Sequence, residues 1–346
     1  MKPVAAALAA IAAFAFSATA ATTACAGKDF DAVKARGQVL CGVGQGTAGF
    51  FLADKQGKWN GLSVDVCRAV SAALFGDASR VSYVPLTAQQ RFTAVQSGEV
   101  DMIVVNATHT LTRDSALGLD FPAIYYYDGQ GFLVPKRLGV KSARDLGGAT
   151  FCVAPGSTSE LNLADYARTH RMPIKTVVIE KADELRTAFF AGRCDVLTSD
   201  SSALAAVRAA SVPAPQKSED FELLPEIISK EPLGPAVRHG DNQFADIVRW
   251  SLYAMIEAEE YGITSENVDE MLKSDNPAIK RLLGATPGMG KALGVDEKWA
   301  YEIVRQVGNY GQSFERNVGQ GSALKIAHGL NRLWTQGGLQ YAWPVR

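Results

Sequence analysis

An arginine in the first half of the sequence has the type and the neighbours of a carboxylate-binding residue. Arg113 follows the stretch "ATHTLT", which brings hydroxyl groups such as that of Thr108 close to it in the chain. A guanidinium can hold a carboxylate with two parallel hydrogen bonds. The alternative is a surface arginine that pairs with the adjacent Asp114.

A second set of polar residues could bind the two ends of a zwitterion. Ser157 and Thr158 lie in "GSTSE", where Ser157 and Glu160 have capping-box spacing. The free N–H groups of a helix N-terminus attract a carboxylate, although ordinary capping explains the same spacing. Asp200, in "LTSDSS", offers a carboxylate for an ammonium group, or else the N-cap of the next helix. With Arg113, these residues would form a site for an α-amino acid, the simplest such zwitterion.

Two segments that must position these residues resemble each other. They are "RFTAVQSGEVDMIVVN" (91–106) and "LRTAFFAGRCDVLTSD" (185–200), which align without gaps and share Thr, Ala, Gly and Asp at matching positions. Each has helical spacing of apolar residues, a glycine typical of a helix C-cap, and a short apolar strand. Asn106 ends one strand and Asp200 ends the other.

The surrounding sequence continues this alternation. Further strands are predicted at 37–44, 81–86, 148–156 and 174–180, and further helices at 63–76 and 159–170. The pattern predicts an α/β fold in which helices pack on a mostly parallel sheet, once in each of two lobes. Ligands of such sheets bind beyond the carboxyl ends of the strands, where Asn106 and Asp200 stand.

Extended stretches with Gly and Pro, at 125–142 and 226–240, are predicted to be two crossings between the lobes. Two crossings make a hinge, and a hinge makes a cleft that can close. We expect a first lobe over 27–132, a second lobe over 133–235, and a return to the first lobe with a helical C-terminal extension over 236–346.

The N-terminus is typical of a secretory signal peptide. Lys2 precedes an apolar run at 4–16, and small-residue exit sites end at Ala20 or Ala26. We expect a signal peptide over 1–26 and a periplasmic product. No lipid anchor is expected at Cys25, because no Leu stands three residues upstream.

Composition excludes several classes of partner. The formal net charge is −1, which gives no electrostatic reason to bind nucleic acid or a membrane surface. No later stretch has the length and apolar purity of a membrane-spanning helix. The remaining cysteines, an even number, suggest disulfides and allow three pairings. Neither they nor the four histidines have metal-ligand spacing, so no metal and no cofactor is expected.

Several motifs resemble those of the periplasmic amino-acid-binding proteins of ABC importers, solute-binding protein family 3. They are "GEVD", "TLTRD", "GSTSE", "GRCDVLTSD" and "LPEIISKEPLGP". "KSDNPAIKRLLG" and "NVGQGSALKIAHGLNRLW" (317–334) resemble the general L-amino-acid-binding branch. The resemblance covers nearly all of the mature chain. It implies a two-lobed periplasmic-binding-protein fold of type II and a monomer that captures L-amino acids by hinge closure and delivers them to a membrane permease.

The resemblance also implies roles for single residues. Arg113 would hold the α-carboxylate with Thr108 and Thr158, and Asp200 would hold the α-ammonium group. The loop from Thr47 to Phe51 would pack near the ligand. The complete predicted binding set is Arg113, Asp200, Thr108, Thr158, Asn106, Ser157, Phe50 and Thr47.

The four remaining cysteines resemble the set of the same branch. We expect the pairs Cys41–Cys67 and Cys152–Cys194, because each would join a strand to a neighbour within one lobe. In a chain-entropy model each bond would stabilise the fold by about 3 kcal/mol.

The chain departs from related binders at positions that bear on the ligand side chain. The first-strand loop, "GQGTAG", has neither the acidic nor the aromatic residue that many related binders have there. Val105 stands where the general branch usually has a basic residue, and His109 where it has an aromatic one. If that basic residue assists an acidic side chain, glutamate and aspartate should bind poorly.

The stretch "GVGQGTAG" also matches the dinucleotide-binding pattern G-x-G-x-x-G. That pattern requires a helix directly after the glycines, whereas "FFLADKQGKWNG" predicts a hairpin. We expect the glycines to make room for a ligand instead. Two alternatives are a periplasmic enzyme on the same fold, such as a dehydratase, and a sensory module. Only His109 could serve as a histidine base near the cleft, so a binding protein without catalysis is the prediction.

Overall fold

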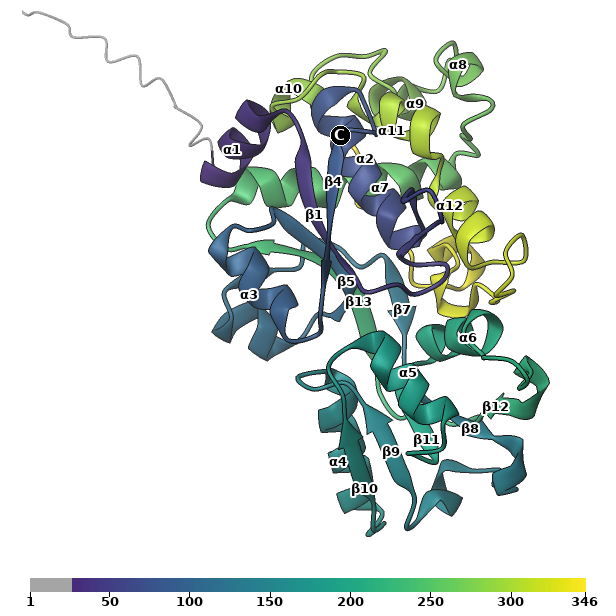
Figure 1. Ribbon diagram of the computed structural model, residues 1–346. Coiled ribbons are helices and arrows are strands. Elements are labelled where there is room, and N and C mark those ends of the chain that lie inside the picture. Colours follow the sequence, from purple (N-terminus) through teal and green to yellow (C-terminus); the bar gives the residue numbers. More distant parts are fainter. Residues whose placement is uncertain (1–26) are drawn as a thin grey trace, which may run out of the picture.

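The computed structural model describes residues 27–346, which form two lobes joined by extended segments (Figure 1). The expected signal peptide and Cys25 lie outside the described residues. Within 27–346, no helix is long and apolar enough to cross a membrane.

The sheet of the first lobe combines strands from both ends of the chain. Its order is β4 (Val81–Leu86), β1 (Val39–Gly44), β5 (Met102–Thr108), β13 (Glu231–Arg238) and β6 (Leu119–Asp120), and β7 (Tyr126–Asp128) also pairs with β13. β1 is parallel to β4 and β5, whereas β13 is antiparallel to β5. A small hairpin of β2 (Leu52–Ala53) and β3 (Trp59–Asn60) follows β1, as predicted.

The second lobe repeats the central arrangement of the first. Its sheet has the order β10 (Lys175–Val178), β9 (Thr150–Val153), β11 (Val196–Asp200), β8 (Gln130–Pro135) and β12 (Phe221–Leu223). β9 is parallel to β10 and β11, and β8 is antiparallel to β11 and β12. The predicted α/β class and two-lobed arrangement are therefore confirmed. The expectation of mostly parallel sheets is wrong, because β8 and β13, which enter the sheets after the crossings, pair antiparallel with their neighbours.

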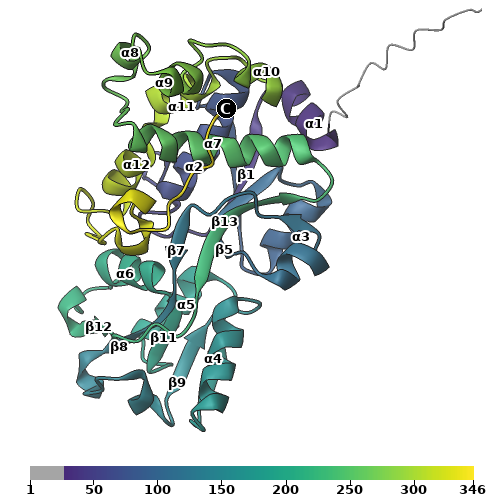
Figure 2. The ribbon, with the colours of Figure 1, turned by 180° about the vertical axis from the view of Figure 1, so that it is seen from behind.

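Helices cover both faces of each sheet. The first lobe has α1 (Lys28–Arg36), α2 (Leu62–Phe75) and α3 (Gln90–Ser97), and the second has α4 (Thr158–Thr169), α5 (Ala182–Phe190) and α6 (Ser201–Ala210). The chain then returns to the first lobe with α7 (Asn242–Glu260), α8 (Val268–Met271), α9 (Pro277–Leu282), α10 (Met289–Leu293), α11 (Trp299–Val307) and α12 (Tyr310–Asn317). The largest apolar core joins α2, α7, α11 and α12 to one face of the first sheet, and Figure 2 shows α7 running across that lobe.

The predicted repeat corresponds to α3–β5 and α5–β11. Gly98 and Gly192 follow the helices with φ of 81° and 76°, a left-handed conformation that glycine adopts without strain. One boundary differs from the prediction, because β5 continues past Asn106 to Thr108. The added residues pair with Leu233 and Gly234 of β13, which the local sequence cannot reveal.

The chain crosses between the lobes just before β8 and again just before β13. β8 belongs to the second sheet from Gln130 onward, and β13 belongs to the first sheet from Glu231 onward. The limits expected from the sequence, 132/133 and 235/236, fall inside these strands. We propose to divide the lobes at 128/129 and 229/230 instead. Helices continue only to Asn317, and the last residues contain two short 3-10 turns, Gly329–Asn331 and Trp334–Gln336.

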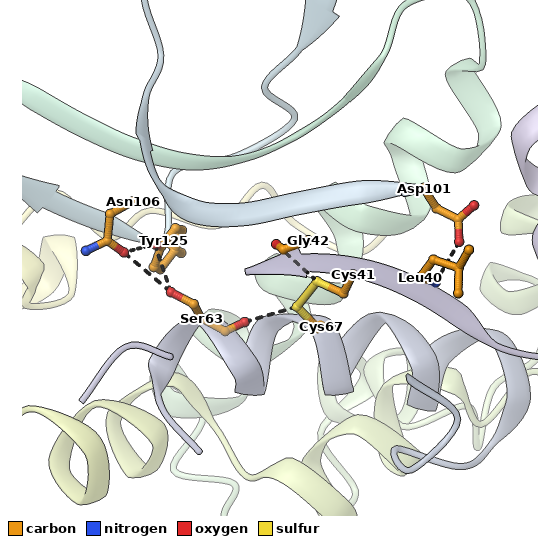
Figure 3. The surroundings of a disulfide bond; sticks show 8 residues. All are labelled: Leu40, Cys41, Gly42, Ser63, Cys67, Asp101, Asn106 and Tyr125. Atoms are coloured by element: carbon orange, nitrogen blue, oxygen red, sulfur yellow. Dashed lines mark hydrogen bonds between the residues drawn. A yellow bond between two sulfur atoms is a disulfide. The ribbon is translucent and has the colours of Figure 1, made fainter. Parts of the chain in front are cut away.

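Both expected disulfides are present, one in each lobe. Cys41 of β1 is bonded to Cys67 of α2, with Cα atoms 6.3 Å apart, as Figure 3 shows. Cys152 of β9 is bonded to Cys194, just before β11, with a Cα separation of 5.6 Å. Each bond ties a strand to a neighbouring element within one lobe, as expected.

Candidate functional site

A cavity of about 180 Å³ lies between the lobes, at the carboxyl ends of their parallel strands. In the first lobe it is lined by the loop after β1, the start of α3 and the end of β5. In the second lobe it is lined by the starts of α4, α5 and α6 and the end of β11. Five of the predicted binding residues line it: Thr47, Asn106, Ser157, Thr158 and Asp200.

Asp200 presents a nearly buried carboxylate, with 8% of the residue exposed. It occupies the N-cap position of α6 but makes no capping hydrogen bond. Asp128 accepts from the backbone N–H of Ser202 at 3.2 Å instead, so the alternative reading of Asp200 as a capping side chain is wrong. Burial raises the pKa of Asp200 well above its usual range, and the negative charges of Asp128 and Glu231 raise it further. A bound ammonium group would reverse this shift.

Arg113 is buried in a short π-helical turn, η1 (Thr112–Ala116). Its Nη1 donates to the carbonyl of Thr108 at 2.8 Å, and its guanidinium lies 4.8 Å from the ring centre of Phe92. Asp114 faces His109 at 3.5 Å, so the alternative of a surface Arg113–Asp114 pair is wrong. Burial lowers the pKa of Arg113, and Glu231 and Asp200 oppose that shift. Arg113 is not among the residues that line the cavity.

Arg91, at the start of α3, is a site residue that the sequence analysis missed. It lines the cavity and is 8% exposed, and its Nε has no hydrogen-bond partner among the described residues. Burial lowers its pKa to about 9, the charge of Arg113 lowers it as well, and Asp200 opposes the shift. The only sequence signal was its place shortly after a predicted strand, at the edge where ligands bind.

Thr108 and Thr158 meet across the cleft, with hydroxyl oxygens 3.3 Å apart. Both donate to Oε2 of Glu231, at 2.5 and 2.9 Å. Oε1 of the same carboxylate accepts from Asn162 at 2.8 Å and from Ser229 at 2.5 Å. Glu231 is 1% exposed and joins β13 of the first lobe to α4 of the second. The sequence analysis gave it no role, since its partners are distant in the chain.

Asn106 is held at the end of the first lobe's central strand by Tyr125, whose hydroxyl donates to Oδ1 at 2.6 Å. The Tyr125 and Ser63 oxygens lie 3.0 Å apart (Figure 3). Asn106 has φ of 53°, an uncommon conformation for a residue other than glycine that occurs often at ligand sites. The carbonyl oxygen is therefore engaged, and the amide N–H₂ remains for a ligand.

Residues 39–267 match the family "Bacterial extracellular solute-binding proteins, family 3". The chain belongs to this family. It is 54% identical to "General L-amino acid-binding periplasmic protein AapJ" of Rhizobium johnstonii, covering 91% of this chain and 92% of that protein. It is 52% identical to "Glutamate/glutamine/aspartate/asparagine-binding protein BztA" of Rhodobacter capsulatus, covering 91% and 93%.

Solved structures support the same family membership. A periplasmic binding protein from Brucella ovis, solved with glutathione bound, is 52% identical and has a TM-score of 0.88, covering 91% of this chain and 98% of that one. A cysteine-binding protein from Campylobacter jejuni is 26% identical with a TM-score of 0.59, covering 72% and 96%.

In this family 3 protein, two residues of the predicted binding set, Ser157 and Phe50, make contacts with the protein itself that give them a structural role. The hydroxyl of Ser157 accepts from the N–H of Glu160 at 3.1 Å and donates to Ala154, so it caps α4. Glu160 accepts from the N–H of Gly156, and the reciprocal bond of a capping box is not formed. Phe50 is fully buried, with its ring edge-on to Tyr126 at 5.3 Å. Phe50 is not among the residues that line the cavity, whereas its neighbour Phe51 is.

The glycine-rich loop of this family member both lines the cavity and packs against the rest of the first lobe. A Cβ on Gly44 would collide with the ring of Phe51, so the space left by the missing side chain is filled by that ring. Thr47 and Phe51 form an isolated antiparallel bridge, and the β2–β3 hairpin follows. The dinucleotide-binding alternative, which requires a helix there, does not hold.

One group of side chains outside the cleft could in principle hold a metal ion. It consists of Asp114, Asp120 and His239, and one oxygen or nitrogen of each lies within 4.8 Å of those of the others. These side chains are partly or fully exposed, and the two aspartates already face His109 and His239 at 3.5 and 3.4 Å. No further observation within 27–346 points to an ion there, so we propose no metal site.

Proposed function

We propose that this chain is a periplasmic receptor that captures free L-α-amino acids and delivers them to the permease of an ABC importer. The observation that carries the proposal is the pairing of opposite charges around one interlobe cavity. Arg91 and Arg113 supply positive charge, and Asp200 supplies a carboxylate without a hydrogen-bond partner in the described chain. Two relatives, the AapJ and BztA proteins, are named as amino-acid-binding proteins.

The α-carboxylate would bind to Arg113 and Arg91, and the α-ammonium group to Asp200. This differs from the expectation that Thr108 and Thr158 complete the carboxylate site, because both hydroxyls already donate to Glu231. A ligand that contacts both lobes stabilises their closed arrangement, since it has more contacts there than in an open one. Closure would then present both lobes to the permease.

The proposal assigns no catalytic step to the cavity. Among its lining residues, Arg91 and Asp200 carry the charges that complement a zwitterion. The proposed location rests on the expected signal peptide and on relatives described as periplasmic. A periplasmic protein that binds amino acids without converting them would serve the uptake of those amino acids into the cell.

A thermal-shift screen of the twenty amino acids, with sugars and polyamines as further candidates, tests the function. We expect α-amino acids to raise the melting temperature and the other classes to leave it unchanged. Arg113→Ala should abolish the shift, because the α-carboxylate loses its bidentate partner. The matched control is Arg168→Ala, since Arg168 is exposed and pairs only with Asp165.

Circular dichroism of each ligand-free variant separates lost binding from lost folding. If no α-amino acid stabilises the folded wild-type protein, the proposed function is wrong. A shift that persists in folded Arg113→Ala would remove Arg113 from the site while leaving the function in place.

A further inference from the structure

A charged side chain of the cavity remains unused by the contacts proposed for the amino-acid head group. Arg186, in the second turn of α5, lines the cavity and is half-buried. Its Nη1 donates to the carbonyl of Gly46, in the loop after β1 of the opposite lobe, at 3.1 Å. This contact holds the guanidinium where the two lobes meet.

Arg186 belongs to a different part of the cavity wall from Asp200. Asp200 ends β11, whereas α5 begins after β10, and β9 lies between these two strands. The two strand ends are therefore separated by two strand spacings, or about 10 Å. A ligand with its head group at Asp200 would reach the α5 side of the cavity only with its side chain.

Among the described residues 27–346, the remaining donors of Arg186 have no acceptor. A guanidinium has five N–H groups, and one of them is used by Gly46. The charge of Asp183 acts on Arg186, but the two form no ion pair in the described chain. Two other acids are engaged elsewhere, since Glu184 pairs with Lys181 at 3.0 Å and Glu180 accepts from Thr87 at 2.6 Å. A half-buried guanidinium with free donors favours an oxygen acceptor in the cavity beside it.

We propose that Arg186 determines side-chain specificity by binding the terminal oxygen of the ligand, as offered by glutamine and glutamate. The inference rests on the proposed function, because it assumes that the head group of an amino acid is bound at Asp200 and Arg113. It disagrees with the hypothesis that acidic amino acids bind poorly, which was based on Val105 standing where related proteins usually have a basic residue. Glu180 also lines the cavity, so the uncharged amide of glutamine avoids a repulsion that glutamate meets.

Isothermal titration calorimetry with glutamine, glutamate and norvaline tests the proposal. Norvaline has the same chain length as the other two ligands but ends in a methyl group. We expect wild-type protein to bind glutamine or glutamate at least about tenfold more tightly than norvaline, as hydrogen bonds to a charged group allow. In Arg186→Met this ratio of dissociation constants should fall to about one, and Arg186→Lys should restore part of it.

The matched control is Arg168→Met, because Arg168 is an exposed arginine of the same lobe that does not line the cavity and that pairs with Asp165 at 3.2 Å. This change should preserve the ratio between ligands. A ratio that survives in Arg186→Met would overturn the proposal, as would equal wild-type affinities for norvaline, glutamine and glutamate. In either case the proposed function stands, whereas binding of no α-amino acid at all would overturn both.

Discussion

At the scale of single residues, Asp200 couples ligand capture to protons. In the ligand-free protein its pKa is raised by burial and by the nearby carboxylates of Asp128 and Glu231. An ammonium group bound beside it would lower that pKa again, so binding should release a proton wherever free Asp200 is protonated. The affinity should then be greatest above the raised pKa, fall as the pH drops through it, and level off below the pKa of the bound state.

Calorimetry in buffers of different ionisation enthalpy measures the released proton directly. We expect release to begin well above pH 3.9, the ordinary value for aspartate. Asp200→Asn should bind far more weakly and show no release with pH. Proton uptake on binding, or a proton release that Asp200→Asn retains, would contradict the assignment of Asp200 to the ammonium group.

Arg91 and Glu231 illustrate what residue-level reasoning could not find. The residues Arg113, Asp200 and Asn106 were predicted because each follows or ends a recognisable strand. Arg91 lies at the start of α3, and the helical spacing of apolar residues was enough to explain that segment of the sequence. No binding role was therefore predicted for Arg91. The partners of Glu231 include Thr108, 123 positions away in the chain, and only the folded arrangement of two lobes brings them together.

At the scale of elements, the junction between β13 and α4 depends on one buried carboxylate. Glu231 accepts hydrogen bonds from Thr108, Thr158, Asn162 and Ser229. In Glu231→Gln one oxygen is replaced by a donor that faces other donors. We expect the free energy of unfolding to fall by about 1–3 kcal/mol, the cost of leaving buried polar groups unpaired.

Urea denaturation, followed by fluorescence and circular dichroism, measures this effect. The control is Glu222→Gln on β12, where the carboxylate pairs with Lys141 at 3.3 Å on the surface. Its loss should cost less than about 1 kcal/mol. Equal stabilities of the two variants would show that the Glu231 network does not hold the junction together.

The elements themselves were largely predictable where their signals are local. Gly98 and Gly192 end the repeated helices, and the apolar runs after them became β5 and β11. The end of β5 was placed two residues early, because its last pairs are with β13, which arrives from another part of the chain. The lobe division that we propose differs by a few residues from the limits expected from the sequence for the same reason, since sheet membership depends on a distant partner strand.

At the scale of the whole molecule, the lobes touch across the cleft through contacts that an open arrangement would lack. Besides the Gly46–Arg186 bond, Thr87 of the first lobe donates to Glu180 of the second at 2.6 Å. Such contacts favour closure independently of the ligand. Because binding and closure are linked, weakening them should raise the dissociation constant.

Glu180→Ala tests this linkage with alanine as ligand, which has no charged side chain to respond to the lost carboxylate. Removing a hydrogen bond worth about 1 kcal/mol should weaken binding about fivefold. Small-angle scattering should show that the radius of gyration of the variant falls on ligand addition as in wild type, but only at higher alanine concentration. The control Glu184→Ala removes a nearby exposed charge, on α5, that pairs with Lys181. If Glu180→Ala and Glu184→Ala bind alanine equally well, the Thr87–Glu180 contact contributes nothing to closure, and the ligand contacts alone drive it.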